Sequence, residues 1–491
     1  MPCTTILVGK KATYDGSTMI ARNDDSPSGS FHVKKATVIL PEDQPDVYVS
    51  VGSHVRVELP DHPLRYTAKP NVDPKEGIWA AAGVNELNVS MSATETITSN
   101  GRVLGADPYV EYHKAEEGRG EVIGGIGEED LVVLVLPYIH SAREGVLRLG
   151  SLLEQYGTYE PNGIAFSDVD EVWWLETIGG HHWIARRVPD DRYVVMPNQF
   201  GMDEFDFKDA YGAKKENLCS SDLCEFVQTH HLDLSLNGKF NPRLAFGSHS
   251  DSDHVYNTPR AWFIERYLNP RTCRWDGPNA DYTPESDDIP WSRVPERKIT
   301  IEDVKYLLSS YYQGTPYNPY AKFGDPTMKG AYRPIGISRT SFLTCTQIRP
   351  YVPKEVQAIE WLAFGSNAFN AFVPLYPGVE ALSGYFSGTT LTVSTESFYW
   401  ANRIIGALAD AHFQVATIHI ERYQEAVEAQ AHNILERYDA LMADEKHDPE
   451  AISNANAEMA AMVKRETEKC LDRVLYEASC HMKNGYSRSD N

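Results

Sequence analysis

Residues 3–25 read CTTILVGKKATYDGSTMIARNDD and predict a β-hairpin at the start of the chain. Thr4 to Val8 contains only β-branched and apolar residues, and Asp15-Gly16 is a common tight-turn pair. Ser17 to Ala21 then predicts the returning strand, which is followed by Arg22-Asn23-Asp24-Asp25. Because the two strands pair, the beginning of this stretch is expected to lie close to its end.

Cys3 stands at the start of the first predicted strand, preceded only by Met1 and Pro2. If those two residues were removed, Cys3 would carry a thiol and a free α-amine, with ordinary pKa values of about 8.5 and about 8. One residue could then provide both a nucleophile and its general base. The alternative is a small buried thiol in the strand, since free cysteine packs well in protein cores.

The hairpin also predicts that Arg22 and Asp25 return close to Cys3. A guanidinium beside a thiol favours the reactive thiolate, and a carboxylate can accept hydrogen bonds from the α-ammonium. The alternative is a surface arginine–aspartate pair, which contributes little to stability. The position of both residues at the end of the strand favours a functional role.

The chain has 491 residues, 42% of them hydrophobic and 23% charged, as is usual for a globular protein. Its formal net charge of −23 argues against nucleic acid or an anionic membrane as a partner, because both would repel it. The longest apolar run, Leu131 to Leu136, is too short to span a membrane. These properties predict a soluble protein that acts on small molecules.

Seven cysteines spread along so long a chain do not form a disulfide framework, which predicts a reducing, cytoplasmic location. Cys219 and Cys224 lack the second pair of ligands that a zinc site needs. The sequence contains neither a Walker A motif nor HExxH, and Gly124-Gly125-Ile126-Gly127 is too weak a match for a dinucleotide loop. We therefore expect no metal and no organic cofactor.

Short strands grouped in hairpins, with helices in separate blocks, predict an α+β fold with antiparallel sheets. Ser141 and Glu144 form a capping-box pattern that opens a helix ending near Gly157. Gly179-Gly180 predicts a hairpin turn between two strands. Further strands are expected at 36–40, 78–82, 87–93, 172–177, 183–188, 193–196, 335–344 and 390–394.

From Tyr399 the pattern is helical almost to the end of the chain, with Ile420, Val427, Ile434 and Leu441 recurring every seven residues. Pro449 is expected to separate two helices. The predicted organisation is one large domain with insertions over 1–398, a helical hairpin packed on it over 399–482, and a disordered tail over 483–491. The acidic composition and the helical tail are compatible with a homo-oligomer.

A series of short motifs carries a resemblance over most of the chain. The chain resembles the dipeptidases of peptidase family C69 (formerly U34), in the branch of the N-terminal-nucleophile (Ntn) hydrolases that contains choloylglycine hydrolase and penicillin V acylase. The motifs, taken together and in order, are Cys3-Thr4-Thr5-Ile6-Leu7-Val8-Gly9-Lys10-Lys11, Asp15-Gly16-Ser17-Thr18, Ala21-Arg22-Asn23, Ser92-Ala93-Thr94-Glu95-Thr96, Gly127-Glu128-Glu129-Asp130, Leu136-Pro137-Tyr138-Ile139, Trp174-Leu175-Glu176-Thr177, Pro197-Asn198-Gln199, Tyr256-Asn257-Thr258-Pro259-Arg260, Tyr312-Gln313-Gly314-Thr315-Pro316-Tyr317 and Phe398-Tyr399-Trp400-Ala401-Asn402-Arg403.

The resemblance implies an αββα sandwich, in which two antiparallel sheets lie between layers of helices. It also implies that Cys3 is the nucleophile and that Arg22 and Asp25 are the arginine and aspartate beside it. Asn198 would help to form the oxyanion hole, where donors stabilise the developing negative oxygen of the attacked amide. Arg260 would be the second arginine of the active site.

A dipeptide carries a free ammonium group that an acylated amine lacks. We hypothesise that Thr94 or Glu95 contacts this ammonium; the alternative is a strand end without any substrate contact. Glu176 is a weaker candidate, which in the alternative only pairs within its hairpin. A conventional Cys–His pair of Cys3 with His182 is less favoured than the N-terminal mechanism.

The expected function is therefore that of a cysteine dipeptidase acting on dipeptides or short peptides after self-cleavage of the Pro2–Cys3 bond. One alternative is an amide hydrolase of the same fold that cleaves N-acyl amino acids or bile-salt-like amides. A second is a secernin-like protein that binds without catalysis, and a third is a cytosolic scaffold. The presence of Cys3, Arg22 and Asp25 favours catalysis.

Overall fold

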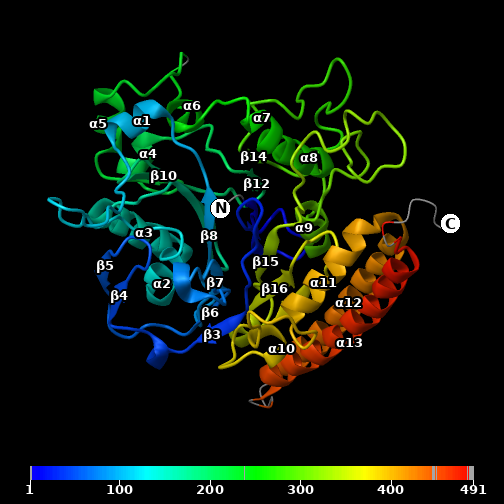
Figure 1. Ribbon diagram of the computed structural model, residues 1–491. Coiled ribbons are helices and arrows are strands. Elements are labelled where there is room, and N and C mark those ends of the chain that lie inside the picture. Colours follow the sequence, from blue (N-terminus) through cyan, green and yellow to red (C-terminus); the bar gives the residue numbers. More distant parts are fainter. Residues whose placement is uncertain (1–2, 237, 445–447, 449, 484, 486–491) are drawn as a thin grey trace.

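The computed structural model describes most of the chain (Figure 1). Met1 and Pro2 lie outside the described residues, and so do the side chains of Thr94 and Glu95. The predicted removal of the first two residues, and the predicted disorder of residues 484 and 486–491, therefore concern parts that the structure leaves undescribed. The described residues are 3–236, 238–444, 448, 450–483 and 485.

Two antiparallel sheets form the centre of the molecule (Figure 1). In the first sheet the strands lie in the order β14 (Ser292–Arg293), β12 (Tyr193–Met196), β1 (Thr4–Val8), β2 (Thr18–Asp25), β15 (Thr340–Ile348), β16 (Ala358–Phe364) and β17 (Val373–Leu375). In the second sheet the order is β13 (Asn217–Cys219), β11 (His182–Arg187), β10 (Val172–Ile178), β9 (Asn162–Ser167), β8 (Ser90–Thr96) and β7 (Ala82–Val84). Two small ribbons pair β3 (Thr37–Ile39) with β6 (Tyr66–Ala68) and β4 (Val47–Val49) with β5 (Arg56–Glu58).

The helices lie on the outer faces of these sheets and in the connections between strands. They are α1 (Gly101–Ala106), α2 (Leu131–Val135), α3 (Ala142–Tyr156), α4 (Phe207–Tyr211), α5 (Leu223–Thr229), α6 (Pro242–Phe246), α7 (Asp253–Tyr256), α8 (Thr258–Leu268), α9 (Ile301–Leu308), α10 (Gly384–Ser387), α11 (Phe398–Ala411), α12 (Phe413–Met442) and α13 (Ala451–Cys480). Short 3₁₀ turns cover Pro41–Asp43, Pro74–Glu76, Leu136–Tyr138 and Lys354–Val356.

The strand register decides which side chains face the interior of the sandwich. Thr5 pairs with Arg22 and Leu7 pairs with Ile20, so odd-numbered residues of β1 share a face with even-numbered residues of β2. Leu7 and Ile20 join Trp174 of the second sheet in one buried apolar cluster. This face of the hairpin therefore looks into the space between the two sheets.

Helices cover the opposite face of each sheet. Ile6 of β1 is buried in a cluster with Ile264 of α8 and Leu307 of α9, while Leu149 of α3 is buried with Trp173 of β10. The order of layers is helix, sheet, sheet, helix, with α2 and α3 on one side and α9 and α11–α13 on the other (Figure 1). The predicted α+β fold with an αββα arrangement is confirmed.

The predicted caps and turns explain where several elements begin and end. The Ser141 hydroxyl accepts from the Glu144 N–H at 3.1 Å and opens α3, but the Glu144 carboxylate accepts from the His140 N–H rather than from Ser141. Gly157 ends the helix with φ of +68°, a backbone conformation that glycine adopts without strain. The helix predicted from Ser141 to Gly157 is therefore confirmed. Of the two hydrogen bonds of the predicted capping box, the one to the Ser141 hydroxyl is present.

Two predicted strands are wrong. The segment 78–82 contains Trp79 and Ala81 at positive φ, which interrupts an extended backbone, and β7 begins only at Ala82. The segment 390–394 is an exposed loop. In that loop the Thr390 carbonyl accepts from Trp400 Nε1 at 2.8 Å instead of pairing with a strand.

The C-terminal segment contains three helices rather than the predicted two, because His412 separates α11 from α12. Ile420, Val427 and Ile434 are buried as their seven-residue spacing predicts, whereas Leu441 near the end of α12 is half exposed. The proposed boundaries at 398 and 482 stay a prediction. No helix within the described residues is both long and apolar enough to cross a membrane.

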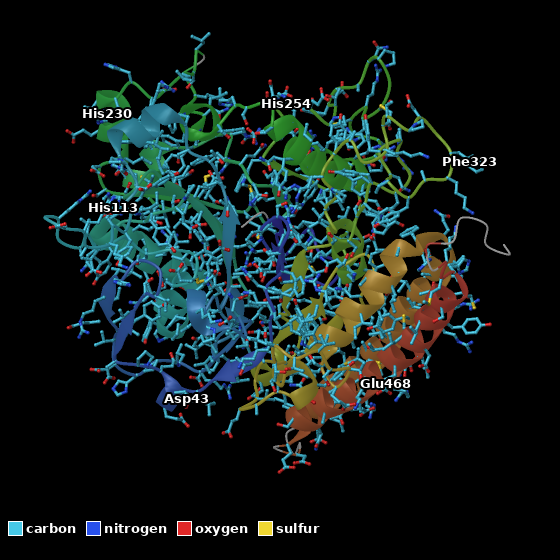
Figure 2. All side chains as sticks on the ribbon, viewed as in Figure 1. Asp43, His113, His230, His254, Phe323 and Glu468 are labelled. Atoms are coloured by element: carbon cyan, nitrogen blue, oxygen red, sulfur yellow. The ribbon has the colours of Figure 1, made fainter. Side chains whose placement is uncertain are left out.

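Side chains fill the space between the layers, while charged residues such as Asp43 and Glu468 lie at the periphery (Figure 2). Phe323 differs from most large apolar residues, because the residue is 88% exposed on a surface loop (Figure 2). The polar groups of functional interest are found where the two sheets face each other, near the start of β1.

Candidate active site

Cys3 is completely buried immediately before β1. Strand alternation directs its side chain to the same face as Thr5 and Leu7, between the sheets. Arg22 Nη2 donates to Cys3 Sγ at 3.0 Å. The predicted proximity of Arg22 and Cys3 is confirmed, and a cation at this distance favours the thiolate form of the cysteine.

Arg22 is held by acceptors from several parts of the chain. Its Nη1 donates to the carbonyl of Ala93 in β8 at 2.5 Å and to that of Ala81 at 3.3 Å. Its Nη2 also contacts Asp24 Oδ1 at 3.0 Å and Glu128 Oε1 at 3.2 Å. The guanidinium therefore connects Cys3 to the second sheet and to two buried carboxylates.

Asp24 lies two residues from Arg22 along β2 and so shares its face. Lys34 Nζ is 3.5 Å from Asp24 Oδ2 and donates to the Trp79 carbonyl at 3.0 Å. Burial alone would raise the pKa of Asp24, but the charges of Lys34 and Arg22 outweigh burial and lower the pKa below its usual value. Asp24 is therefore a carboxylate that neutralises part of the local positive charge.

Asp25 lies on the opposite face of β2 from Arg22 and Asp24, as its position in the strand requires. Its carboxylate contacts Arg333 Nη2 and accepts from the Thr340 hydroxyl at 2.5 Å. Asp25 was predicted to contact the α-amine of Cys3. The Cys3 nitrogen is an amide nitrogen while Pro2 is attached, and it becomes an amine only after removal of Met1-Pro2. The catalytic role of Asp25 stays a prediction.

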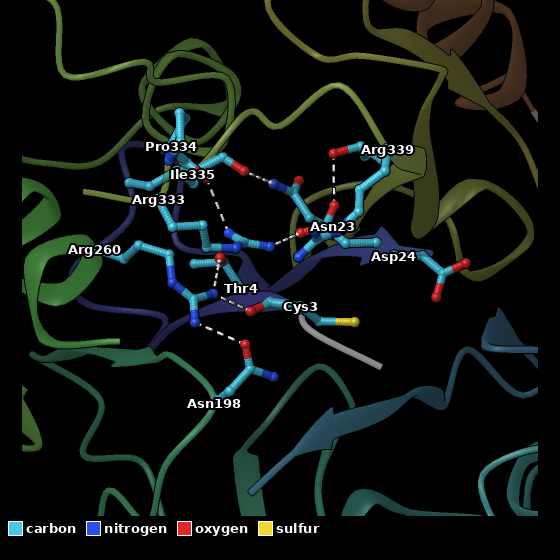
Figure 3. Close-up of polar contacts among 12 residues, drawn as sticks. Cys3, Thr4, Asn23, Asp24, Asn198, Arg260, Arg333, Pro334, Ile335 and Arg339 are labelled. Carbon is cyan, nitrogen blue, oxygen red and sulfur yellow. Dashed lines mark hydrogen bonds and ion pairs between the residues drawn. The ribbon is translucent and has the colours of Figure 1, made fainter. Parts of the chain in front are cut away.

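Arg260, in the first turns of α8, connects Cys3 with Asn198 (Figure 3). Its Nη1 donates to the Cys3 carbonyl and to Thr4 Oγ1, the latter at 2.7 Å. Its Nη2 donates to Asn198 Oδ1 and to Asn257 Oδ1, both at 2.7 Å. The structure thus brings together three of the predicted site residues, Cys3, Asn198 and Arg260.

Asn198 follows the end of β12 and is buried. Because Arg260 donates to Oδ1, the amide nitrogen must lie on the other side of the group, where Nδ2 donates to the Thr96 carbonyl at 3.0 Å. The Asn198 carbonyl accepts from Asn257 Nδ2 at 3.0 Å. These bonds fix the orientation of the amide, which is what a pre-organised oxyanion donor requires.

Two acidic residues extend the network on the far side of Arg22. Glu128 is buried in the segment before α2, and its N–H donates to Glu160 Oε1 at 2.7 Å. Burial and the negative charge of Glu128 raise the pKa of Glu160 to about 7. The region on the far side of Arg22 from Cys3 is therefore acidic.

Thr94 and Glu95 belong to β8, in which the pairing with β9 shifts between Ala93 and Glu95. Such a bulge changes the direction of side chains on a strand. The side chains of Thr94 and Glu95 lie outside the described residues. Their predicted contact with the substrate ammonium therefore stays a prediction.

His182 and Glu176 belong to other contacts. His182 Nδ1 is 2.7 Å from Asp107 Oδ2, and the ring stacks on Phe226 at 3.9 Å between centroids. Glu176 accepts from the Gly201 N–H at 2.7 Å and from Trp174 Nε1 at 3.1 Å. These hydrogen bonds hold the backbone at Gly201 against β10.

Within the described residues, no group of three or more His, Cys, Asp or Glu side chains could hold a metal ion.

Four residues of this network were missed in the sequence. Asp24 could have been found, since strand alternation places it rather than Asp25 on the face of Arg22. Glu128 was quoted only as part of a family motif. Lys34 and Glu160 have no signal of their own, because long-range folding alone brings them to the site.

Comparisons with known proteins show the family of the chain. The model of the family described as "Peptidase family C69" matches residues 2–426. A protein named "Dipeptidase" from Bifidobacterium longum is 55% identical over the full length of both chains. A "Probable dipeptidase A" from Streptococcus pyogenes serotype M3 is 52% identical, also over both full lengths. "Dipeptidase A" of Lactobacillus helveticus is 42% identical over 97% of this chain and 96% of its own. The chain belongs to peptidase family C69 and is a peptidase.

Proposed function

We propose that this peptidase is a cysteine dipeptidase in which Cys3 attacks the scissile carbonyl of a dipeptide or short peptide. The observation that carries the proposal is the 3.0 Å contact between Arg22 Nη2 and the buried sulfur of Cys3, immediately before β1. The names of the relatives support dipeptides as the substrate class. His182 contacts Asp107 and stacks on Phe226, which supports the N-terminal-nucleophile mechanism rather than a Cys–His pair.

In the proposed reaction the Pro2–Cys3 bond is first hydrolysed by self-cleavage, which frees the α-amine of Cys3. That amine accepts the thiol proton as Sγ bonds to the scissile carbonyl carbon. The carbon–nitrogen bond then breaks, and the leaving amino acid takes the proton. Water adds to the thioester, the first amino acid is released, and the thiol is restored.

Asn198 and nearby backbone N–H groups would stabilise the negative oxygen of both tetrahedral intermediates. Arg260 would keep the Asn198 amide in place through Oδ1, and Asp25 would accept from the freed α-amine of Cys3. The proposal requires neither a metal nor an organic cofactor. We further propose a cytoplasmic location and a homo-oligomeric state, on the basis of the free cysteines and the acidic composition.

The test combines the intact mass of the purified protein with an assay of free-amine dipeptides and their N-acetylated counterparts. We expect loss of Met1-Pro2 and hydrolysis of free-amine dipeptides that Cys3→Ala abolishes. Preferred hydrolysis of N-acylated amino acids would instead indicate an acylase. An active protein that retains Pro2 would refute the α-amine as base, and an intact leader on inactive protein would favour a binding role.

A further inference from the structure

The side chain of Glu128 occupies a specific place relative to the nucleophile. Its Oε1 and Cys3 Sγ both contact Arg22 Nη2, at 3.2 and 3.0 Å. The two atoms therefore lie within about 6 Å of each other on these contact distances. Glu160 extends the acidic surface beyond Glu128, because its carboxylate accepts from the Glu128 N–H at 2.7 Å.

The covalent geometry of a dipeptide limits where its ammonium can lie during the reaction. Standard bond lengths and angles place the α-nitrogen about 2.5 Å from the carbonyl carbon of the same residue. Once Cys3 Sγ approaches this carbon, the ammonium must lie within a few ångströms of the sulfur. A carboxylate group that already contacts the same arginine as the sulfur is within reach of that ammonium.

The charges of the network also favour a cation at this place. Arg260 bonds to the main-chain carbonyl of Cys3 and to Asn198. On the side of the sulfur, contacts starting at Cys3 Sγ connect two cations, Arg22 and Lys34, with three carboxyl groups, those of Asp24, Glu128 and Glu160. Burying like charges together is costly, and a substrate ammonium between Glu128 and Glu160 would offset this cost. The raised pKa of Glu160, about 7, is consistent with the excess of negative charge.

We infer that Glu128 and Glu160 bind the α-ammonium of the substrate and so select peptides with a free amino terminus. This inference rests on the proposed dipeptidase function. The sequence suggested Thr94 or Glu95 for this role, and the inference assigns it to Glu128 and Glu160 instead. Glu128 lies in the segment before α2, and Glu160 lies in the turn between α3 and β9. An N-acylated substrate would place an uncharged amide in this acidic region and would bind less well.

The experiment compares alanyl-p-nitroanilide with N-acetyl-alanyl-p-nitroanilide, which have the same scissile bond and differ in the ammonium. We expect wild-type kcat/KM to be at least a hundredfold higher for the free amine. Glu128→Gln and Glu160→Gln should each lower kcat/KM for the free amine at least tenfold, mainly through KM. The value for the N-acetyl substrate should change less than threefold.

Glu129→Gln is the matched control, because Glu129 is the buried neighbour of Glu128 but bonds to Ser50 and Tyr159. It should keep the wild-type preference. Alaninol, which has the ammonium but no carbonyl, should slow iodoacetamide alkylation of Cys3 in wild type. This protection should weaken at least tenfold in the Glu128 and Glu160 variants, even where N-acetyl hydrolysis is too slow to measure.

The outcomes separate the two proposals. Equal losses on both substrates would show that Glu128 acts only by positioning Arg22 and would overturn the ammonium site, while the dipeptidase function stands. Unchanged KM in both variants would overturn it as well. Failure of the wild-type protein to cleave any free-amine substrate would refute the proposed function and this inference together.

Discussion

A single nitrogen of Arg22, Nη2, contacts the sulfur of Cys3 at 3.0 Å and also the carboxylate of Glu128 at 3.2 Å. The cation that favours the thiolate is thus shared with carboxylates, which reduces its effect on the sulfur. Its position, in contrast, is strongly fixed, because two carbonyl groups of the facing segments accept from Nη1. Arg22 therefore fixes the arrangement of the groups around the Cys3 sulfur.

Replacing Arg22 by methionine should raise the pKa of the Cys3 thiol. The substitution removes the guanidinium that donates to Sγ at 3.0 Å, so the thiolate loses the stabilising charge of that group. We expect the pH midpoint of iodoacetamide alkylation, measured on the Cys3 peptide by mass spectrometry, to rise by about one unit or more, and kcat/KM to fall at least a hundredfold.

Arg349→Met is the control for this prediction, because Arg349 is an equally buried arginine that pairs with Asp439 of α12. It should lower thermal stability without moving the alkylation midpoint. An unchanged midpoint in Arg22→Met would contradict the electrostatic role of Arg22 and leave it a structural residue.

Replacing Lys34 by methionine should both destabilise the fold and impair activity. Lys34 and Asp24 are fully buried, and removal of Lys34 leaves the Asp24 carboxylate with the Arg22 guanidinium but without its second cation. Breaking a buried pair costs about 3–5 kcal/mol, and we expect a loss up to this size. Denaturant unfolding measures this loss. Because Asp24 also contacts Arg22, we expect kcat/KM to fall as well.

The control for Lys34→Met is a second buried ion pair, formed by Lys69 and Glu360. Lys69→Met should destabilise by a similar amount while the surviving folded protein keeps its kcat/KM. Equal activity losses in the two variants would mean that Lys34 acts on stability alone.

Glu176 predicts a specific dependence of stability on pH. Burial raises its pKa from 4.5 to about 7, despite the hydrogen bonds it accepts. Between these values the folded state holds a proton that the unfolded state has lost, so the stability contribution is present at low pH and is lost as pH rises towards 7. At pH 8 the charged form costs about 3 kcal/mol.

Glu176→Gln removes this titration but keeps an oxygen to accept from the Gly201 N–H. Relative to wild type, its free energy of unfolding should therefore increase from pH 5 to pH 8, by about 3 kcal/mol in total. Urea unfolding across this range measures the difference. A constant difference between the two proteins would show that the Glu176 carboxyl group titrates normally.

The β1–β2 hairpin and the αββα arrangement were predictable, because turn residues and alternating apolar residues are local signals. The positions of Cys3 and Arg22 follow from the hairpin alone. The prediction for Asp25 could have been sharper, since alternation along β2 places Asp24, not Asp25, on the face of Arg22.

Other parts of the site depend on contacts that no local pattern encodes. Glu128 reaches Arg22 across 106 positions, and Arg260 reaches Cys3 across 257 positions. The predicted strand at 390–394 shows the opposite error, in which β-branched residues occupy an exposed loop. Propensity alone does not supply the neighbouring strand that such a segment needs.

Arg260 is expected to act on catalysis through Asn198 rather than through the sulfur. It donates to Asn198 Oδ1 at 2.7 Å and to the main-chain carbonyl of Cys3. Arg260→Met should therefore lower kcat, by about 10²–10³ if the oxyanion donor is lost entirely, because the Asn198 amide is no longer held in place. The alkylation midpoint of Cys3 should stay unchanged, in contrast to that of Arg22→Met.

A double-mutant cycle with Asn198→Ala tests this positioning role directly. If Arg260 acts through Asn198, the second substitution should add little to the kcat loss of the first, so the two effects are strongly non-additive. Fully additive losses would mean that Arg260 stabilises the transition state by itself. A shifted alkylation midpoint would instead place its action on the nucleophile, and thermal melting of each variant separates both results from simple unfolding.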